Sequence, residues 1–239
     1  MTLNRNQLKY LVIVAMLMDH IAWAYVPTNS IPAFFLHLIG RTTGPTMAFF
    51  LAEGFYYSKN IKAYACRLGI FSLISWPAFT LFEFGELPLY REGGHWQIHY
   101  NFPVLFTLFL SLIALWVWYK SSYSKSMKHI IVLCLAFLTV TSDWGVLDMM
   151  FAFYFYENRG DKKKLIRGYL IFGLIFSTLS LLGSDQFWFG LSMFGVLFVA
   201  LLISKYNGEK GSDKPIHKWF FYVFYPLHLL MIWGIGRMI

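Results

Sequence analysis

Long runs of apolar residues, separated by short polar connections, extend along nearly the whole chain. Most runs approach the roughly 20 residues that an α-helix needs to cross a bilayer, and a shielded helix needs fewer. The pattern therefore predicts an all-α fold, a polytopic transmembrane helical bundle of about nine spans. The predicted spans lie near residues 7–26, 31–57, 62–84, 103–119, 128–142, 144–157, 165–182, 187–204 and 218–238.

The second predicted span, 31–57, is unusually long and contains Gly44 followed by Pro45. Proline removes a backbone donor and clashes with the preceding turn, so we expect a kink or an unwound turn there. The connections between the spans are all too short to hold a soluble domain. We therefore expect a single transmembrane domain over residues 1–239.

Composition agrees with a membrane protein, because 58% of the residues are hydrophobic and only 13% are charged. Soluble domains usually carry about 25% charged residues. The two cysteines, Cys66 and Cys134, stand alone in apolar segments, which argues against a disulfide or a metal site. The first apolar run, 7–26, lacks a small-residue cleavage site, so we interpret it as a retained helix rather than a signal peptide.

The basic residues predict which side of the membrane each connection occupies. Nearly all of them fall on one side of the nine spans, which leaves Arg91 and Arg237 on the other and Arg41 inside a span. Cytoplasmic loops are enriched in Lys and Arg, so we expect the N-terminus inside and the C-terminus outside a bacterial cytoplasmic (inner) membrane. This distribution explains the net charge of +8 better than nucleic-acid binding does. The residues on the predicted cytoplasmic side are Arg5, Lys9, Lys59, Lys62, Arg67, Lys120, Lys125, Lys128, Arg159, Lys162, Lys163, Lys164, Arg167, Lys205, Lys210, Lys214 and Lys218.

Several ionisable side chains lie inside the predicted spans or at their ends. Each costs several kcal/mol in hydrocarbon unless it is paired or hydrated, so each is a functional candidate. The alternative is a buried ion-pair network that holds the helices together, although such pairs add little net stability. These residues are Asp19, His20, Arg41, Glu53, Arg67, Asp143, Asp148 and His228.

Histidine is the side chain best suited to accept a proton near neutral pH, which makes His20 a candidate general base. Asp19 is its neighbour in sequence, and adjacent helical residues point about 100° apart. Asp19 is therefore poorly placed to orient His20. A carboxylate from another helix, Asp143 or Asp148, is better placed to do so.

Five segments of the chain resemble one family when they are taken together. The resemblance is to the TraX family of bacterial membrane proteins, whose founding member is linked to N-terminal acetylation of conjugative pilin. It runs in order over nearly the whole chain, but residues 42–45 depart from a Phe-Pro-rich form of the family at this point. The segments are MLMDHI at 16–21, RTTGP at 41–45 continued by FFLAEGF at 49–55, YACRL at 64–68, TSDWG at 141–145 and FYVFYPLHL at 221–229.

The resemblance implies acyl transfer from acetyl-CoA, in which a histidine on an early helix serves as the base, as in broader membrane acyltransferases. This favours His20, with Arg41 stabilising the developing oxyanion. Asp143 would orient a histidine or bind the ammonium group of an acceptor. His228 would be a second acid/base or positioning group. The catalytic residues expected on this basis are His20, Asp19, Arg41, Asp143 and His228.

The donor would bind from the cytoplasm and would need cations for its phosphates. Arg67 and Lys62 lie near the predicted inner mouth. The expected donor-binding residues are Arg67, Glu53, Lys62 and Tyr225. We expect acetyl-CoA as a donor substrate, with no permanently bound cofactor and no metal.

The acceptor is left open among a peptide N-terminus, a glycan and a small molecule, and either an amine or a hydroxyl would serve. The expected surroundings are the lipid bilayer, and nucleic acid is not an expected partner. The main alternative is a proton-coupled transporter or exporter, because buried Asp, His and Arg residues also form proton relays. A third hypothesis is an assembly factor whose charges only hold the helices together. Binding of a CoA thioester separates the first hypothesis from the transporter.

Overall fold

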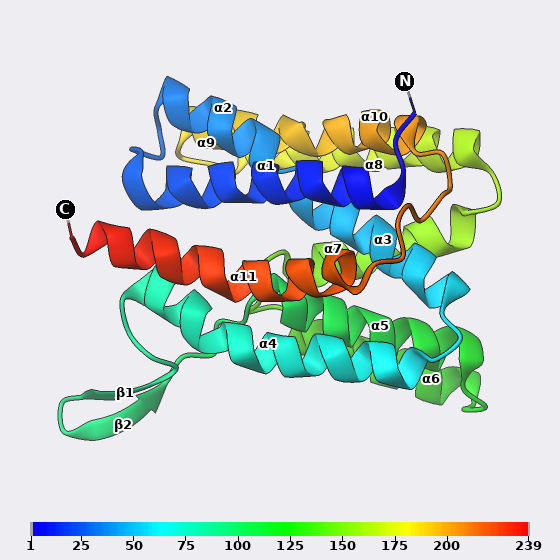
Figure 1. Ribbon diagram of the computed structural model, residues 1–239, viewed down its shortest axis with the longest axis horizontal. Helices are drawn as coiled ribbons and strands as arrows, with labels where there is room; N and C mark the ends of the chain where they lie inside the picture. The colour runs from blue at the N-terminus through cyan, green and yellow to red at the C-terminus, as the bar shows by residue number, and fades with distance from the viewer. Residues whose placement is uncertain (1, 239) are drawn as a thin grey trace. The chain divides into compact units, whose positions relative to one another are not determined.

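The computed structural model describes residues 2–238, and helices make up most of this part of the chain (Figure 1). A two-stranded hairpin and one 3₁₀ segment, η1, are the exceptions among the elements described. The elements are α1 (Arg5–Tyr25), α2 (Ile31–Gly40), α3 (Thr43–Tyr57), α4 (Ile61–Phe84), β1 (Leu89–Glu92), β2 (His95–Ile98), α5 (Val104–Lys120), α6 (Lys125–Leu138), α7 (Gly145–Asn158), α8 (Lys162–Leu182), α9 (Phe187–Ser192), η1 (Met193–Leu197), α10 (Phe198–Lys205) and α11 (Pro215–Gly236).

The all-helical fold expected from the sequence is confirmed. Within residues 2–238, five helical stretches are long and apolar enough to cross a membrane: α1, α4, α8, α11 and the run from α9 to α10. Helix α5 is a shorter apolar helix. Every predicted span except the second matches an observed helix or helical run, with ends that differ by at most four residues.

The second predicted span, 31–57, consists of two helices, α2 and α3, that are interrupted at Arg41 and Thr42. The interruption precedes Gly44 and Pro45, where the kink was expected. Proline disturbs the helix one turn earlier, because it cannot donate to the carbonyl of the residue four positions before it, which is Arg41. The hydroxyl of Thr42 donates to the carbonyl of Ile39 at 2.7 Å and helps to close the end of α2.

The connection between α4 and α5 contains a hairpin that was not predicted from the sequence. Strands β1 and β2 pair antiparallel, with Leu89 opposite Ile98 and Glu92 opposite His95. The ring of His99 stacks between Phe84 and Tyr90, with centroids 4.4 Å apart in both pairs. The stacking ties the hairpin to the end of α4.

Contacts divide the chain into two compact units. Among residues 2–238, unit 1 contains residues 2–47, 157–221 and 238, and unit 2 contains residues 48–156 and 222–237. The single domain expected over residues 1–239 stays a prediction.

In unit 1, helix α2 packs against α1, α9 and η1, and helix α8 packs against α9, η1 and α10. The 3₁₀ segment η1 leaves backbone carbonyls without the usual helical donors. Hydroxyls of α8 serve instead: Tyr169 donates to the carbonyl of Val196 at 2.8 Å, and Ser177 donates to that of Met193 at 2.9 Å. The side chains of α8 therefore stabilise the irregular segment against which α2 packs.

One end of unit 1 gathers several of its basic residues. The amide of Leu3 donates to the carbonyl of Lys205, and the ammonium of Lys162 donates to the carbonyls of Ser204 and Tyr206 at 2.9 Å. The starts of α1 and α8 and the end of α10 therefore meet at the same end of unit 1.

In unit 2, helix α5 packs between α4 and α6. Leu110, Ala114 and Met149 form the centre of a cluster that joins α5 to α7. The ammonium of Lys120 lies 4.7 Å from the ring centroid of Phe55, so the ends of α5 and α3 meet.

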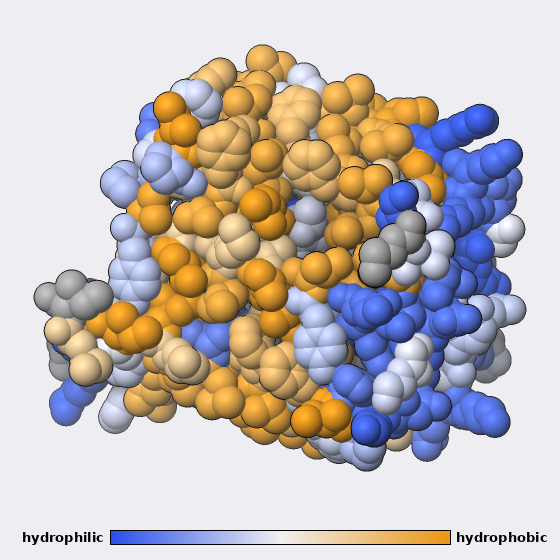
Figure 2. Space-filling model, turned by 45° about the horizontal axis from the view of Figure 1, so that its top comes forward, coloured by the Kyte–Doolittle hydropathy of each residue, from blue (hydrophilic) through white to orange (hydrophobic). Residues whose placement is uncertain are grey.

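Large apolar side chains are exposed along several helices. Leu11 and Val14 of α1, Phe137 of α6, and Ile171 and Leu182 of α8 are each at least half exposed. Figure 2 shows hydrophobic residues over most of the face in view, with hydrophilic residues gathered to one side. Apolar exposure on this scale is typical of helices that face lipid.

Candidate functional site

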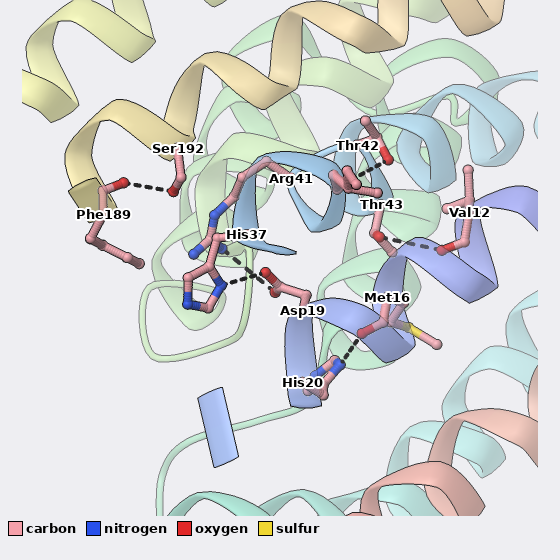
Figure 3. A network of polar contacts seen from close by, with 11 residues as sticks. Val12, Met16, Asp19, His20, His37, Arg41, Thr42, Thr43, Phe189 and Ser192 are labelled. Atoms are coloured by element: carbon pink, nitrogen blue, oxygen red, sulfur yellow. Dashed lines mark hydrogen bonds and ion pairs between the residues drawn. The ribbon is translucent and has the colours of Figure 1, made fainter. Parts of the chain in front are cut away.

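The side chain of Asp19, on α1, is directed towards helix α2 in unit 1 (Figure 3). It packs against Gly40, where an added Cβ would lie only 2.3 Å from the Cβ of Asp19. Real Cβ atoms essentially never come so close. Glycine at position 40 is therefore what allows the carboxylate to reach this side of α2.

Two side chains near the end of α2 meet this carboxylate. The Nδ1 atom of His37 lies 2.7 Å from Oδ1 of Asp19, and NH1 of Arg41 lies 3.9 Å from Oδ2 (Figure 3). Residues four apart on a helix share a face, which explains how both side chains reach one partner. The carboxylate thus forms a hydrogen bond with a histidine and an ion pair with an arginine.

Aromatic rings cover this group of residues. The ring of Trp23 lies 4.8 Å from that of His37, and the ring of Phe189 lies 5.8 Å from it. The guanidinium carbon of Arg41 lies 5.1 Å from the centroid of Phe189. His37 is 0% exposed and Arg41 is 7% exposed. Electrostatic interactions in such a dry environment are much stronger than in water.

The second ring nitrogen of His37 is the most informative atom of the site. In the neutral ring, an Nδ1–H group donates to the carboxylate of Asp19, so the lone pair lies on Nε2. This Nε2 atom is buried and has no hydrogen-bond partner among residues 2–238. Buried polar atoms are normally satisfied, and an exception calls for an explanation. The Nε2 lone pair is therefore an acceptor that lacks a donor among residues 2–238.

His20, the expected base, has a different environment. Its Nδ1 lies 2.8 Å from the carbonyl oxygen of Met16, and its ring points away from Asp19 and His37 (Figure 3). The sequence-based inference that Asp19 would not orient His20 agrees with this arrangement. The carboxylates expected to orient His20, Asp143 and Asp148, both belong to unit 2.

The expected donor-binding residues lie in unit 2. The guanidinium carbon of Arg67 lies 5.8 Å from the ring centroid of Tyr64, and its side chain is hydrogen-bonded to Tyr222. Lys62 is exposed and Glu53 is half-buried. Tyr225 is buried, with its ring 5.5 Å from that of His228. Arg67 therefore interacts with Tyr222, and the ring of Tyr225 packs against that of His228.

The turn that precedes α7 also lies in unit 2. Thr107 donates to the backbone carbonyl of Asp143 at 2.9 Å, and Trp144 adopts a φ of 57°, in the left-handed region that non-glycine residues rarely occupy. Such backbone strain often accompanies functional sites.

Asp148, in the first turn of α7, is 0% exposed, and its two carboxylate oxygens have no hydrogen-bond partner within residues 2–238. His228 uses Nδ1 to donate to the carbonyl of Phe224 at 3.0 Å.

Comparison with known proteins identifies the family of the chain. The profile described as "TraX protein" matches residues 4–236 of the chain. The chain belongs to the TraX family. A relative from Dichelobacter nodosus, "Probable fimbrial assembly protein FimC, serogroup H1", is 30% identical over 239 residues, which cover 95% of this chain and 93% of the relative. No solved structure is significantly similar to the chain.

The family resemblance inferred from the sequence is therefore confirmed, and it extends over the helices of both units. The site residue missed by sequence reasoning is His37. One signal was present, because His37 and Arg41 are four residues apart and so lie on one face of a helix. Among the described residues, no group of three or more His, Cys, Asp or Glu side chains is arranged to hold a metal ion.

Proposed function

We propose that this protein is a membrane-embedded acetyltransferase that moves an acetyl group from acetyl-CoA to an amine or hydroxyl of an acceptor. An intramembrane histidine acts as the general base. The observation that carries the proposal is the buried group formed by Asp19, His37 and Arg41, in which a carboxylate orients a histidine beside a fixed cation. Acyl transfer is promoted by a base for the attacking group and by a positive charge or hydrogen-bond donors for the oxyanion.

Family membership supports the choice of acetyl transfer over other acid–base chemistry, because the founding member of the TraX family is linked to acetylation of pilin. The name of the Dichelobacter relative refers to fimbrial assembly. For this chain we propose an acceptor among the subunits of a surface fibre. A peptide amine is the simplest acceptor of this kind, and a hydroxyl or a glycan on a subunit is the alternative.

We further propose that the chain crosses the bacterial cytoplasmic membrane nine times, with the N-terminus inside and the C-terminus outside. Helices α2 and α3 would together form one broken span, and the run from α9 to α10 would form another. Non-helical backbone at membrane depth is tolerated where protein surrounds it. Arg41 is buried at the interruption between α2 and α3, which supports this arrangement.

In this proposal, the donor's phosphates bind at the cytoplasmic side of unit 2. Arg67 is the main candidate, since its guanidinium is held by Tyr222 and lies near the ring of Tyr64. Lys62 is exposed in the first turn of the same helix, α4, and adds a second positive charge. Guanidinium groups suit phosphate because they donate in a planar, bidentate geometry.

The test is acetyl-CoA binding by the purified, full-length protein in detergent. Wild type is compared with Arg67→Gln, and Arg91→Gln in the exposed hairpin serves as a matched control. We expect wild type and the control to bind alike, and the Arg67 variant to bind at least about tenfold more weakly, which corresponds to about 1.4 kcal/mol. Absence of binding in folded wild-type protein would contradict the proposal and favour the proton-coupled transporter.

A further inference from the structure

We infer that His37, rather than His20, is the residue that accepts and returns the proton in the reaction, and that Asp19 is its positioning residue. This inference rests on the proposed acetyltransferase function. It adds a catalytic residue that neither the spacing of the sequence motifs nor the family resemblance identified.

The hydrogen bond between His37 and Asp19 sets the chemistry of the ring. With Nδ1–H held by Oδ1 of Asp19 at 2.7 Å, the neutral ring presents its lone pair at Nε2. A carboxylate that holds Nδ1 also stabilises the imidazolium that forms when Nε2 takes a proton. The unpartnered, buried Nε2 atom is therefore the basic atom of this group.

The charge of the group around His37 changes by one unit when the ring takes a proton. The carboxylate of Asp19 and the guanidinium of Arg41 offset each other when His37 is neutral. When the ring gains a proton, the carboxylate faces a positive charge on each of its oxygens. Arg41 limits how strongly the group holds that proton, so the proton can be passed on.

His20 lacks this support at Nδ1. Its Nδ1 partner is the carbonyl of Met16, which is a neutral acceptor, at 2.8 Å. Hydrogen bonds to an ionised acceptor are about twice as strong as those between neutral groups. The carboxylate of Asp19 therefore favours a charged His37 more than the carbonyl of Met16 favours a charged His20.

The reaction step balances with a single group that shuttles the proton. The nitrogen or oxygen of the acceptor attacks the carbonyl carbon of acetyl-CoA, and a C–N or C–O bond forms. The proton of the attacking group moves to Nε2 of His37. The C–S bond then breaks, its electron pair stays on sulfur, and His37 returns the proton to give the CoA thiol. No oxidant, reductant or further reactant is needed.

Two aromatic side chains control access to His37. The Trp23 ring covers His37 at 4.8 Å and is itself 44% exposed, and Phe189 is half-buried. An acceptor therefore reaches Nε2 by displacing these rings rather than by unfolding a helix.

The first experiment compares rates of acetyl-CoA turnover across pH for full-length variants. We expect His37→Gln to lose about 10²–10⁴-fold in rate, the usual contribution of a general base. We expect His20→Gln to lose less than about tenfold on the same scale. His129→Gln is the control, because His129 makes the same Nδ1 bond to a carbonyl four residues earlier, at 2.7 Å, but on the exposed surface of α6. A full loss in the His20 variant with retained turnover in the His37 variant would overturn the inference.

Asp19→Asn separates positioning from simple packing. The amide is the same size but does not supply the negative charge, so the midpoint of the pH–rate profile should move to lower pH. Addition of imidazole to His37→Ala should restore part of the rate. A profile that keeps its midpoint in the Asp19 variant would contradict the positioning role.

The second experiment does not depend on activity. In ¹⁵N-histidine-labelled protein, the charge-assisted Nδ1–H group should give a strongly downfield proton resonance. It should disappear in Asp19→Asn and in His37→Gln and persist in His20→Gln. Absence of this resonance in wild type would overturn the inference. Its presence in a wild type that does not bind acetyl-CoA would support the Asp19–His37 pair and refute the acetyl-CoA donor.

Discussion

Substitution of Gly195 by alanine should disturb the site from a position outside it. Gly195 lies in η1, and an added Cβ would stand 1.9 Å from the carbonyl oxygen of Leu38 and 3.0 Å from the Cβ of Arg41. Ordinary contact begins at 3.4 Å, so the backbone of α2 would have to move by about 1.5 Å. A flexible side chain can turn aside from such a contact, whereas a helix backbone must shift as a whole.

The shift acts on the proposed catalytic group because Leu38 directly follows His37 on α2 and stands three residues before Arg41, which caps this helix. A movement of this size is large enough to break a 2.7 Å hydrogen bond between His37 and Asp19. Overpacking of this kind typically costs about 1–3 kcal/mol of stability. A displacement of about 1 Å in a catalytic group is typically worth about 10²-fold in rate.

The assay is thermal unfolding in detergent, run beside acetyl-CoA turnover and the downfield histidine resonance. Gly234→Ala in α11 is the matched control, because no atom lies within 4 Å of its added Cβ. The control should be unchanged or more stable by about 0.5–1 kcal/mol, since alanine favours a helix. A Gly195→Ala protein that melts like wild type and keeps the resonance would refute the argument that α2 is held against η1 at this position.

Three further predictions concern other parts of the chain. Tyr169→Phe removes the donor to the buried carbonyl of Val196 and should lower the free energy of unfolding by about 1–3 kcal/mol, as measured by chemical or thermal denaturation. Asp148→Asn should leave the melting temperature unchanged or higher, because the carboxylate makes no hydrogen bond to residues 2–238; a marked decrease would indicate a bound cation as its partner. Alkaline phosphatase fused after Ile239 should be active, since the enzyme folds only outside the cytoplasm, and an inactive fusion of normal abundance would contradict the proposed orientation.

The helix positions could be predicted well from the sequence because apolar length is a strong signal in membrane proteins. The interruption at Arg41 was displaced from its predicted site because proline acts on the carbonyl one turn earlier. The hairpin formed by β1 and β2 was missed, because residues 85–102 lack a strong alternation of apolar and polar positions. Its base depends on stacking of His99 between Phe84 and Tyr90, and one of these rings lies outside the connection, on α4.

The candidate site could be predicted only in part. Asp19 and Arg41 stood out because charged residues are costly inside a span. His37 did not, since a single histidine in a short apolar segment carries a weak signal by itself. Its role depends on the packing of α2 against α1 through Gly40, and spacing within one helix does not specify which other helix it contacts.

The most direct test of the account measures release of the CoA thiol from acetyl-CoA by purified wild-type protein and by His37→Gln. The account predicts that wild type binds acetyl-CoA and hydrolyses it slowly. It also predicts that the variant binds equally well but releases thiol at least about 100-fold more slowly. Folded wild-type protein that neither binds nor hydrolyses acetyl-CoA would contradict the central claim.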